Sequence, residues 1–106
     1  MIQVEENARK WEVRLSQKAQ KQKKELPEKV LAVFARLLGE MERSGPIRKN
    51  WPHFSILQKD KRIPPNAYHC HIKKGRPTYV VCWQVMDKKI QIVEVFYVGT
   101  HENAPY

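Results

Sequence analysis

Four histidines, His53, His69, His71 and His101, are the residues of this sequence best suited to move protons near neutral pH. His69 and His71 lie two residues apart in a stretch that alternates apolar and polar side chains, and Lys73 continues the alternation. A strand with this period of two places His69, His71 and Lys73 on one face. Because burying three such groups without partners is costly, we expect this face to be exposed to solvent and to serve a function.

Side chains of this kind are the ones that cleaving RNA requires. Attack by a ribose 2′-hydroxyl on the adjacent phosphate needs a base, donors that stabilise the phosphoryl oxygens, and an acid or cation for the departing 5′-oxygen. Histidine can act as acid or base, lysine and arginine bind phosphate, and tyrosine can stack on a base. From residue 46 onward the sequence has all four histidines and ten Lys and Arg against four Asp and Glu.

The charge of the whole chain agrees with a polyanionic partner. Its 106 residues include 20 Lys and Arg against 11 Asp and Glu, a formal net charge of +9. RNA, DNA, an anionic membrane or an acidic protein would all suit this charge, and so would a merely soluble surface. The length predicts a single domain over 1–106, with a frayed start at 1–10.

The two cysteines, Cys70 and Cys82, match no zinc or thioredoxin spacing and lie in apolar runs, so we expect two buried thiols in a reducing compartment. No stretch approaches the ~20 apolar residues of a membrane span. Residues 1–10 lack the apolar core of a signal peptide. We therefore expect a cytoplasmic protein without membrane contact.

The hydrophobic pattern predicts an α+β fold in which two N-terminal helices pack on a largely antiparallel sheet of four to five strands. Ser16 is expected to cap the first, basic helix, and Gly45-Pro46 to end the second. The nearly continuous apolar run at 78–86 is typical of a central strand that is covered on both faces. The expected elements are a strand at 11–15, helices at 16–26 and from 27 to 45, a short strand within 51–57, and strands at 67–73, 78–86 and 90–98.

A zinc site is the first alternative use of the histidines. A His-x-His pair on a strand can bind zinc, and His53 or His101 could add a third ligand. However, no carboxylate or further cysteine has matching spacing, and the surrounding positive charge opposes a divalent cation. We expect no metal and no other cofactor.

Several short motifs resemble the RelE/ParE superfamily of type II toxin–antitoxin toxins. The stretch 68–73, with its Cys-His-Ile, and the tail 98–101, with its Gly-Thr-His, are similar to YafQ-type toxins. The pattern Tyr-x-x-x-x-Gln-Val at 79–85 and the Val-Gly before the tail resemble RelE, and the helical stretch 17–45 fits the paired helices of the family. The resemblance implies a metal-independent endoribonuclease that cuts mRNA in the ribosomal A site and inhibits translation. It also implies a cognate antitoxin, with operator DNA bound only through the toxin–antitoxin complex.

The resemblance also implies roles for individual residues. His71 corresponds to the catalytic histidine of Cys-His-Ile, His101 to the histidine of the tail, and Tyr106, displaced by about one residue, to the tail aromatic. The key arginine of RelE falls on Val80, which cannot replace it, so Arg76 in the preceding turn is expected to bind the phosphate instead.

Further residues complete the expected site. Lys73 would help Arg76 to stabilise the phosphate, and His101 and His71 would share the proton transfers. Tyr106 would position a base or assist at the 2′-hydroxyl. The residues expected to contact RNA are His69, Lys59, Lys61, Arg62 and Lys74, and their charge predicts a marked dependence on salt.

Two other functions remain open from the sequence. A ParE-like inhibitor of DNA gyrase would share the fold without the nuclease residues, and a catalytically inert basic module would bind nucleic acid alone. The histidines of the strand and of the tail favour the nuclease.

Overall fold

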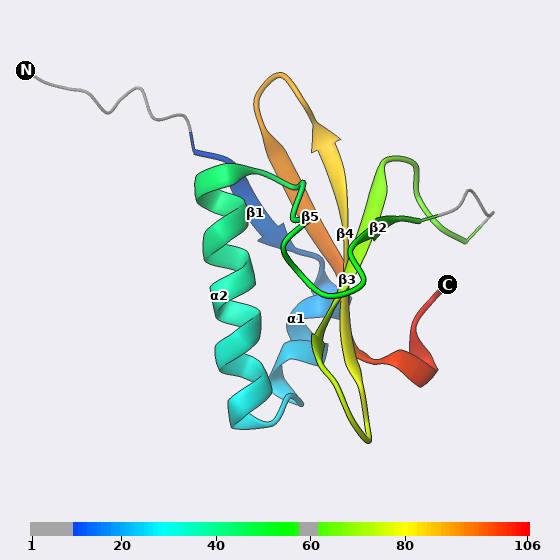
Figure 1. Ribbon diagram of the computed structural model, residues 1–106. Helices are drawn as coiled ribbons and strands as arrows, with labels where there is room; N and C mark the ends of the chain where they lie inside the picture. Colours follow the sequence, from blue (N-terminus) through cyan, green and yellow to red (C-terminus); the bar gives the residue numbers. More distant parts are fainter. Residues whose placement is uncertain (1–9, 58–61) are drawn as a thin grey trace, which may run out of the picture.

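The computed structural model describes residues 10–57 and 62–106, in which two helices pack on one face of a five-stranded, mostly antiparallel sheet (Figure 1). This α+β arrangement confirms the fold class predicted from the sequence. The strand order is β1-β5-β4-β3-β2, and only β1 runs parallel to its neighbour. The elements are β1 Glu12–Leu15, α1 Gln17–Lys24, α2 Glu28–Ser44, β2 Ser55–Ile56, β3 Ala67–Lys73, β4 Tyr79–Asp87, β5 Ile92–Thr100 and the 3₁₀ helix η1 His101–Asn103.

The helices begin and end where local chemistry allows. The Ser16 hydroxyl accepts a hydrogen bond from the Ala19 amide at 3.0 Å, which confirms the predicted cap of α1. Gly45 ends α2 with a φ of 91°, a conformation that glycine adopts at little cost. Val30, Phe34, Leu37 and Met41 of the apolar stripe of α2 are fully buried, whereas Leu38 is partly buried against the same core. Neither helix in the described part of the chain combines the length and apolar character needed to cross a bilayer.

The sheet has two covered faces. On the helix side, Val81 and Trp83 of β4 join the main core with Phe34 of α2. On the other side, the distal face, Val80 and Cys82 form a smaller core with residues that include Leu57, Ala67 and Tyr97, and Ala104 of the C-terminal tail packs against it. The tail, red in Figure 1, therefore lies across the sheet from the helices. This confirms that β4 is a central strand covered on both faces.

Both cysteines are free and buried, as predicted. Burial raises the pKa of the Cys70 thiol to about 12 and also raises that of Cys82. The thiols stay protonated at neutral pH, so they behave as small apolar groups and not as nucleophiles.

The β4–β5 hairpin differs from the sequence-based prediction, which began the last strand at residue 90. The Asp87 carboxylate accepts a hydrogen bond from the Ile90 amide at 3.0 Å, and Gln91 adopts a φ of 59°. Ile90 is therefore part of the turn and 66% exposed. Polar turn chemistry overrides the apolar pattern here, so β5 begins at Ile92 and continues to Thr100.

The Val-Gly pair at the end of β5 has a steric basis. The Tyr97 hydroxyl donates a hydrogen bond to the Thr100 carbonyl at 2.6 Å, which passes the phenol ring beneath Gly99. A Cβ atom on Gly99 would lie 2.8 Å from the Tyr97 oxygen and 3.1 Å from its ring. Any side chain at this position must displace Tyr97, and with it the start of the tail that leads to His101.

We expect Gly99→Ala to lower the free energy of unfolding by about 1–3 kcal/mol, because overpacked side chains must move off their preferred rotamers. Urea denaturation measures this change. Gly39→Ala is the matched control: its Cβ would meet only the end of the flexible Arg43 side chain, at 3.3 Å. The control should be stabilising by up to about 1 kcal/mol, as expected for Gly→Ala within a helix. Equal stability of Gly99→Ala and the wild type would contradict the steric account.

Candidate active site

The four histidines and Tyr106 form one cluster of rings on the distal face of the sheet. The ring of His71 stacks on that of His53, with centroids 4.2 Å apart and an interplanar angle of 24°. The His101 ring meets the edge of His71 at 5.4 Å. Tyr106 lies 4.5 Å from His69 and 5.9 Å from His101. Residues more than fifty positions apart in the sequence thus form one continuous cluster of aromatic rings.

Backbone hydrogen bonds bring this cluster together from three parts of the chain. The His71 amide on β3 donates to the Pro52 carbonyl at 2.8 Å, which holds the loop carrying His53 against the strand. The His101 amide donates to the Thr78 carbonyl at 2.8 Å, which attaches the tail beside β4. The 3₁₀ turn of η1 then projects His101 toward His71.

The expectation of a fully exposed row on β3 is wrong for His69, which is only 9% exposed. In the register of the sheet His69 pairs with Cys82 and His71 with Val80, so both histidines share the distal face with its small core. His69 avoids an unpartnered burial because its Nδ1 lies 3.2 Å from the Ser55 hydroxyl and its ring meets Tyr106. Burial lowers the pKa of His69, so its imidazole is neutral at physiological pH.

Lys73 departs from the row for a different reason. The β3–β4 register shifts between His71 and Lys73, which disrupts the alternation that would have aligned Lys73 with the histidines. Lys73 and Lys74 are both exposed and line a hollow of about 480 Å³ together with His53 and His71. The two lysines therefore still lie beside the cluster.

A second, larger hollow is also lined by His71. Its volume is about 600 Å³, and Gly75, Arg76 and Thr78 of the β3–β4 turn line it together with His71 and His101; Pro77 and Glu102 complete the lining. Arg76, predicted to bind a phosphate, is thus brought to the same cavity as the two histidines predicted to move protons. An anion in this cavity would lie among a guanidinium and two imidazoles.

The electrostatics of the cluster set the protonation states. Burial, followed by the nearby charges of His53, His69 and His101, lowers the pKa of His71 to about 4. His71 is therefore neutral at pH 7 and able to accept a proton. Burial raises the pKa of Tyr106, so its hydroxyl keeps its proton at neutral pH and acts as a hydrogen-bond donor.

The other residues named from the sequence lie away from this cavity or cannot be placed. Lys59 and Lys61 fall outside the described residues. Arg62 is exposed on the β2–β3 connection, and neither hollow beside the histidines is lined by it. Val80 is fully buried.

His53 is the member of the cluster to which the sequence analysis gave no role in the nuclease site. It adopts a φ of 56° in the loop before β2, and this local turn sets its ring on His71. The only signal in the sequence was its residue type. The histidine rings stack face to face or edge to face, and among residues 10–57 and 62–106 no group of three His, Cys, Asp or Glu side chains is placed to hold a metal ion.

Comparison with solved structures identifies the fold as that of RelE toxins. The archaeal RelE–RelB complex of Pyrococcus horikoshii aligns with a TM-score of 0.67 at 14% identity, over 90% of this chain and 99% of the matched chain. The intact E. coli RelBE toxin–antitoxin complex aligns with a TM-score of 0.59 at 26% identity, over 88% of this chain and 99% of the matched chain. The isolated E. coli RelE toxin aligns with a TM-score of 0.63 at 24% identity, over 89% of this chain and 87% of the matched chain. No protein-family model and no curated protein matches the sequence. The resemblance to RelE toxins stated from the motifs is confirmed.

The lowered pKa of His71 predicts a loss of stability in acid. The unfolded chain takes up the imidazole proton near the ordinary value of 6.5, whereas the folded protein takes it up only near 4. Stability from this source is complete above pH 6.5 and falls as the pH drops from 6.5 toward 4, and His69 contributes with the same sign.

Urea denaturation near neutral pH and near pH 5 tests this linkage. The wild type should lose stability on acidification, and His71→Asn should lose less, because asparagine does not titrate. The double variant with His69→Asn should lose less still. An acid-induced loss in His71→Asn as large as that of the wild type would show that His71 is not the group responsible.

Proposed function

We propose that this chain is the toxin of a type II toxin–antitoxin pair and an endoribonuclease that cuts mRNA on the ribosome without a metal ion. The observation that carries the proposal is the approach of His71 to His101, at 5.4 Å between ring centroids, beside a cavity that Arg76 also lines. The RelE fold supports the same assignment. Catalysis in such a cavity needs only side chains that move protons and stabilise charge.

His71 is the general base in this proposal. Neutral at pH 7, it takes the proton of the ribose 2′-hydroxyl as that oxygen attacks the adjacent phosphorus. A base with a pKa near 4 would be weak in the free enzyme. The phosphate of a bound substrate is anionic, however, and an anion beside an imidazole raises its pKa toward neutrality. The substrate thus strengthens the base that it uses.

His101 is the corresponding general acid. It gives a proton to the 5′-oxygen as the bond from phosphorus to that oxygen breaks, which leaves a 2′,3′-cyclic phosphate and a free 5′-hydroxyl. Arg76 and Lys73 stabilise the charge that builds on the phosphoryl oxygens. Tyr106, protonated and 40% exposed, donates a hydrogen bond or stacks on a base of the mRNA. His53, stacked on His71, holds the base in place.

The partners follow from the same assignment. A cognate antitoxin would bind the basic protein and neutralise it, and operator DNA would be bound only through that complex. Lys59, Lys61, Arg62 and Lys74, with His69, would contribute to contacts with mRNA or ribosomal RNA, and these contacts would weaken as salt increases. On this proposal the protein acts in the cytoplasm.

Cleavage of mRNA on purified ribosomes tests the proposal. His71→Ala, His101→Ala and Arg76→Ala should each slow single-turnover cleavage by roughly 10²–10⁴-fold, the usual contribution of a positioned acid, base or charge-stabilising group. Lys88→Ala removes the same charge from the distant β4–β5 turn and should cleave at the wild-type rate. Activity should be unchanged by a chelator of divalent ions under conditions that keep the ribosomes intact.

Expression in growing cells separates this proposal from its rivals. The expected result is rapid loss of protein synthesis with cut mRNA. DNA damage with intact mRNA would instead indicate a ParE-like inhibitor of gyrase. Growth arrest that is as strong with His101→Ala as with the wild type would exclude acid–base catalysis by His101 and favour an inert binding module.

A further inference from the structure

We propose that Glu40, which lies on α2 and outside the cavity, is a positioning residue for the histidine cluster. Glu40 would act by anchoring the 46–54 segment, which leads from α2 to β2 and carries His53. Its effect on cleavage rests on the proposed nuclease function, but its effect on His71 does not.

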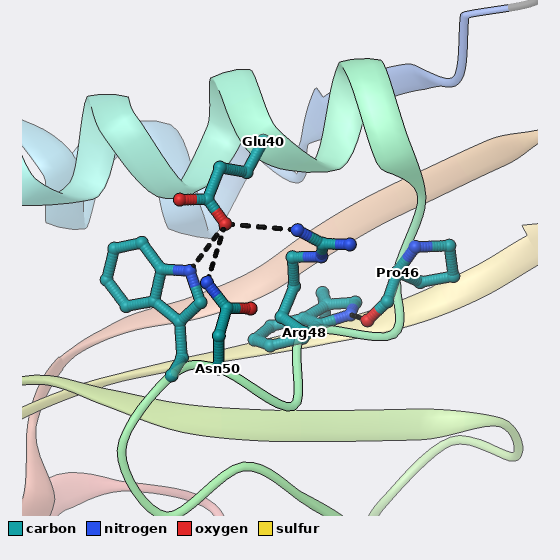
Figure 2. A network of polar contacts seen from close by, with 6 residues as sticks. Glu40, Pro46, Arg48 and Asn50 are labelled. Atoms are coloured by element: carbon teal, nitrogen blue, oxygen red, sulfur yellow. Dashed lines mark hydrogen bonds and ion pairs between the residues drawn. The ribbon is translucent and has the colours of Figure 1, made fainter.

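The Glu40 carboxylate anchors the 46–54 segment through side-chain hydrogen bonds, which Figure 2 shows in close-up. One oxygen of the Glu40 carboxylate accepts hydrogen bonds from Trp51 Nε1 at 2.8 Å, Arg48 Nη1 at 3.0 Å and Asn50 Nδ2 at 3.4 Å. The bond from Trp51, the largest influence, and those from the other two donors lower the pKa of Glu40. The carboxylate is therefore charged at neutral pH, and its hydrogen bonds are of the stronger, charge-assisted kind.

Two further contacts fix the same segment. The Trp83 indole donates to the Pro46 carbonyl at 3.1 Å, and the Arg36 guanidinium lies 4.8 Å from the centre of the Trp51 ring. Trp51 itself is 5% exposed and belongs to the main core on the helix side. The segment is thus held on the helix side of the sheet at Pro46 and at Trp51.

The 46–54 segment passes around the edge of the sheet. Trp51 packs on the helix side, yet His53, two residues later, stacks on His71 on the distal face. β2 pairs with β3 only at Ser55 and Ile56, opposite His69 and Tyr68, so the β3 edge at His71 is left to this segment. The Pro52 carbonyl occupies that edge by accepting the His71 amide.

The anchored Trp51, which binds Glu40, lies only two residues before His53, and His53 stacks on His71. The single residue between Trp51 and His53 is Pro52, whose carbonyl accepts the hydrogen bond of the His71 amide. Releasing Trp51 would free the backbone that sets both the ring and the amide contact of His71. The loss would also leave Arg48, whose side chain is 14% exposed, without its carboxylate partner, which would disturb the segment further.

Titration of His71 by NMR, with the full-length protein and no RNA, tests this inference first. In Glu40→Ala the His53 ring should leave His71, whose pKa should then rise from about 4 toward the ordinary 6.5. The amide of His71 should also exchange with solvent faster, since its bond to Pro52 is weakened. A loss of overall stability alone would not move the titration of the folded protein.

Glu40→Gln and Glu42→Ala are the matched controls. Glutamine retains a side-chain oxygen that can accept from Trp51, so Glu40→Gln should restore the wild-type titration of His71. Glu42 is exposed on the same helix, and its replacement makes the same change in net charge. If Glu40→Ala fails to fold, Trp51→Phe removes only the indole donor while it keeps an aromatic ring in the core, and it should shift His71 in the same direction.

Single-turnover cleavage then separates this inference from the proposed function. In Glu40→Ala the rate at saturating ribosome-bound mRNA should fall by up to about 10²-fold, with the affinity for substrate little changed, as expected when a catalytic group is misplaced. A shifted His71 without any cleavage by the wild type would support the positioning role and refute the nuclease. An active wild type with His71 unmoved in Glu40→Ala and Trp51→Phe would overturn the positioning role.

Discussion

The hydrogen bond from the His71 amide to the Pro52 carbonyl is the contact on which the histidine cluster depends. This bond satisfies the β3 edge at His71, where β2 no longer pairs with β3, and it holds the neighbouring His53 ring on His71. A second backbone hydrogen bond, from the His101 amide to the Thr78 carbonyl, places the His101 imidazole against His71. The positions of the imidazoles are therefore set by backbone hydrogen bonds.

Crowding four imidazoles has an electrostatic consequence. Partial burial and the neighbouring histidines all disfavour a proton on His71, so the free protein holds a neutral base in a strongly basic molecule. An anion that enters beside Arg76 would reverse this balance. A phosphodiester bound there would change the protonation of the site, as the proposed cleavage of RNA requires.

Much of the fold could be predicted from the sequence because its elements obey local rules. The Ser16 cap, the apolar stripe of α2 and the double burial of β4 all follow from hydrophobic period and capping chemistry. The start of β5 could not be predicted in this way, because the Ile90 amide donates a hydrogen bond to the Asp87 side chain and so belongs to the turn. The burial of His69 could not either: it depends on Tyr106, which arrives from the end of the chain. The placement of His53 on His71 could not be predicted, because it depends on the path of the whole 46–54 loop around the sheet edge, and residue spacing does not specify that path.

The central claim is that His71 and His101 act together on one phosphodiester, and a double-variant cycle on the single-turnover cleavage of ribosome-bound mRNA tests it most directly. Groups that act as a unit are not additive, so the variant that lacks both histidines should be little slower than the slower single variant. Losses that multiply, or a single variant that cleaves at the wild-type rate, would show that the two imidazoles do not share the reaction.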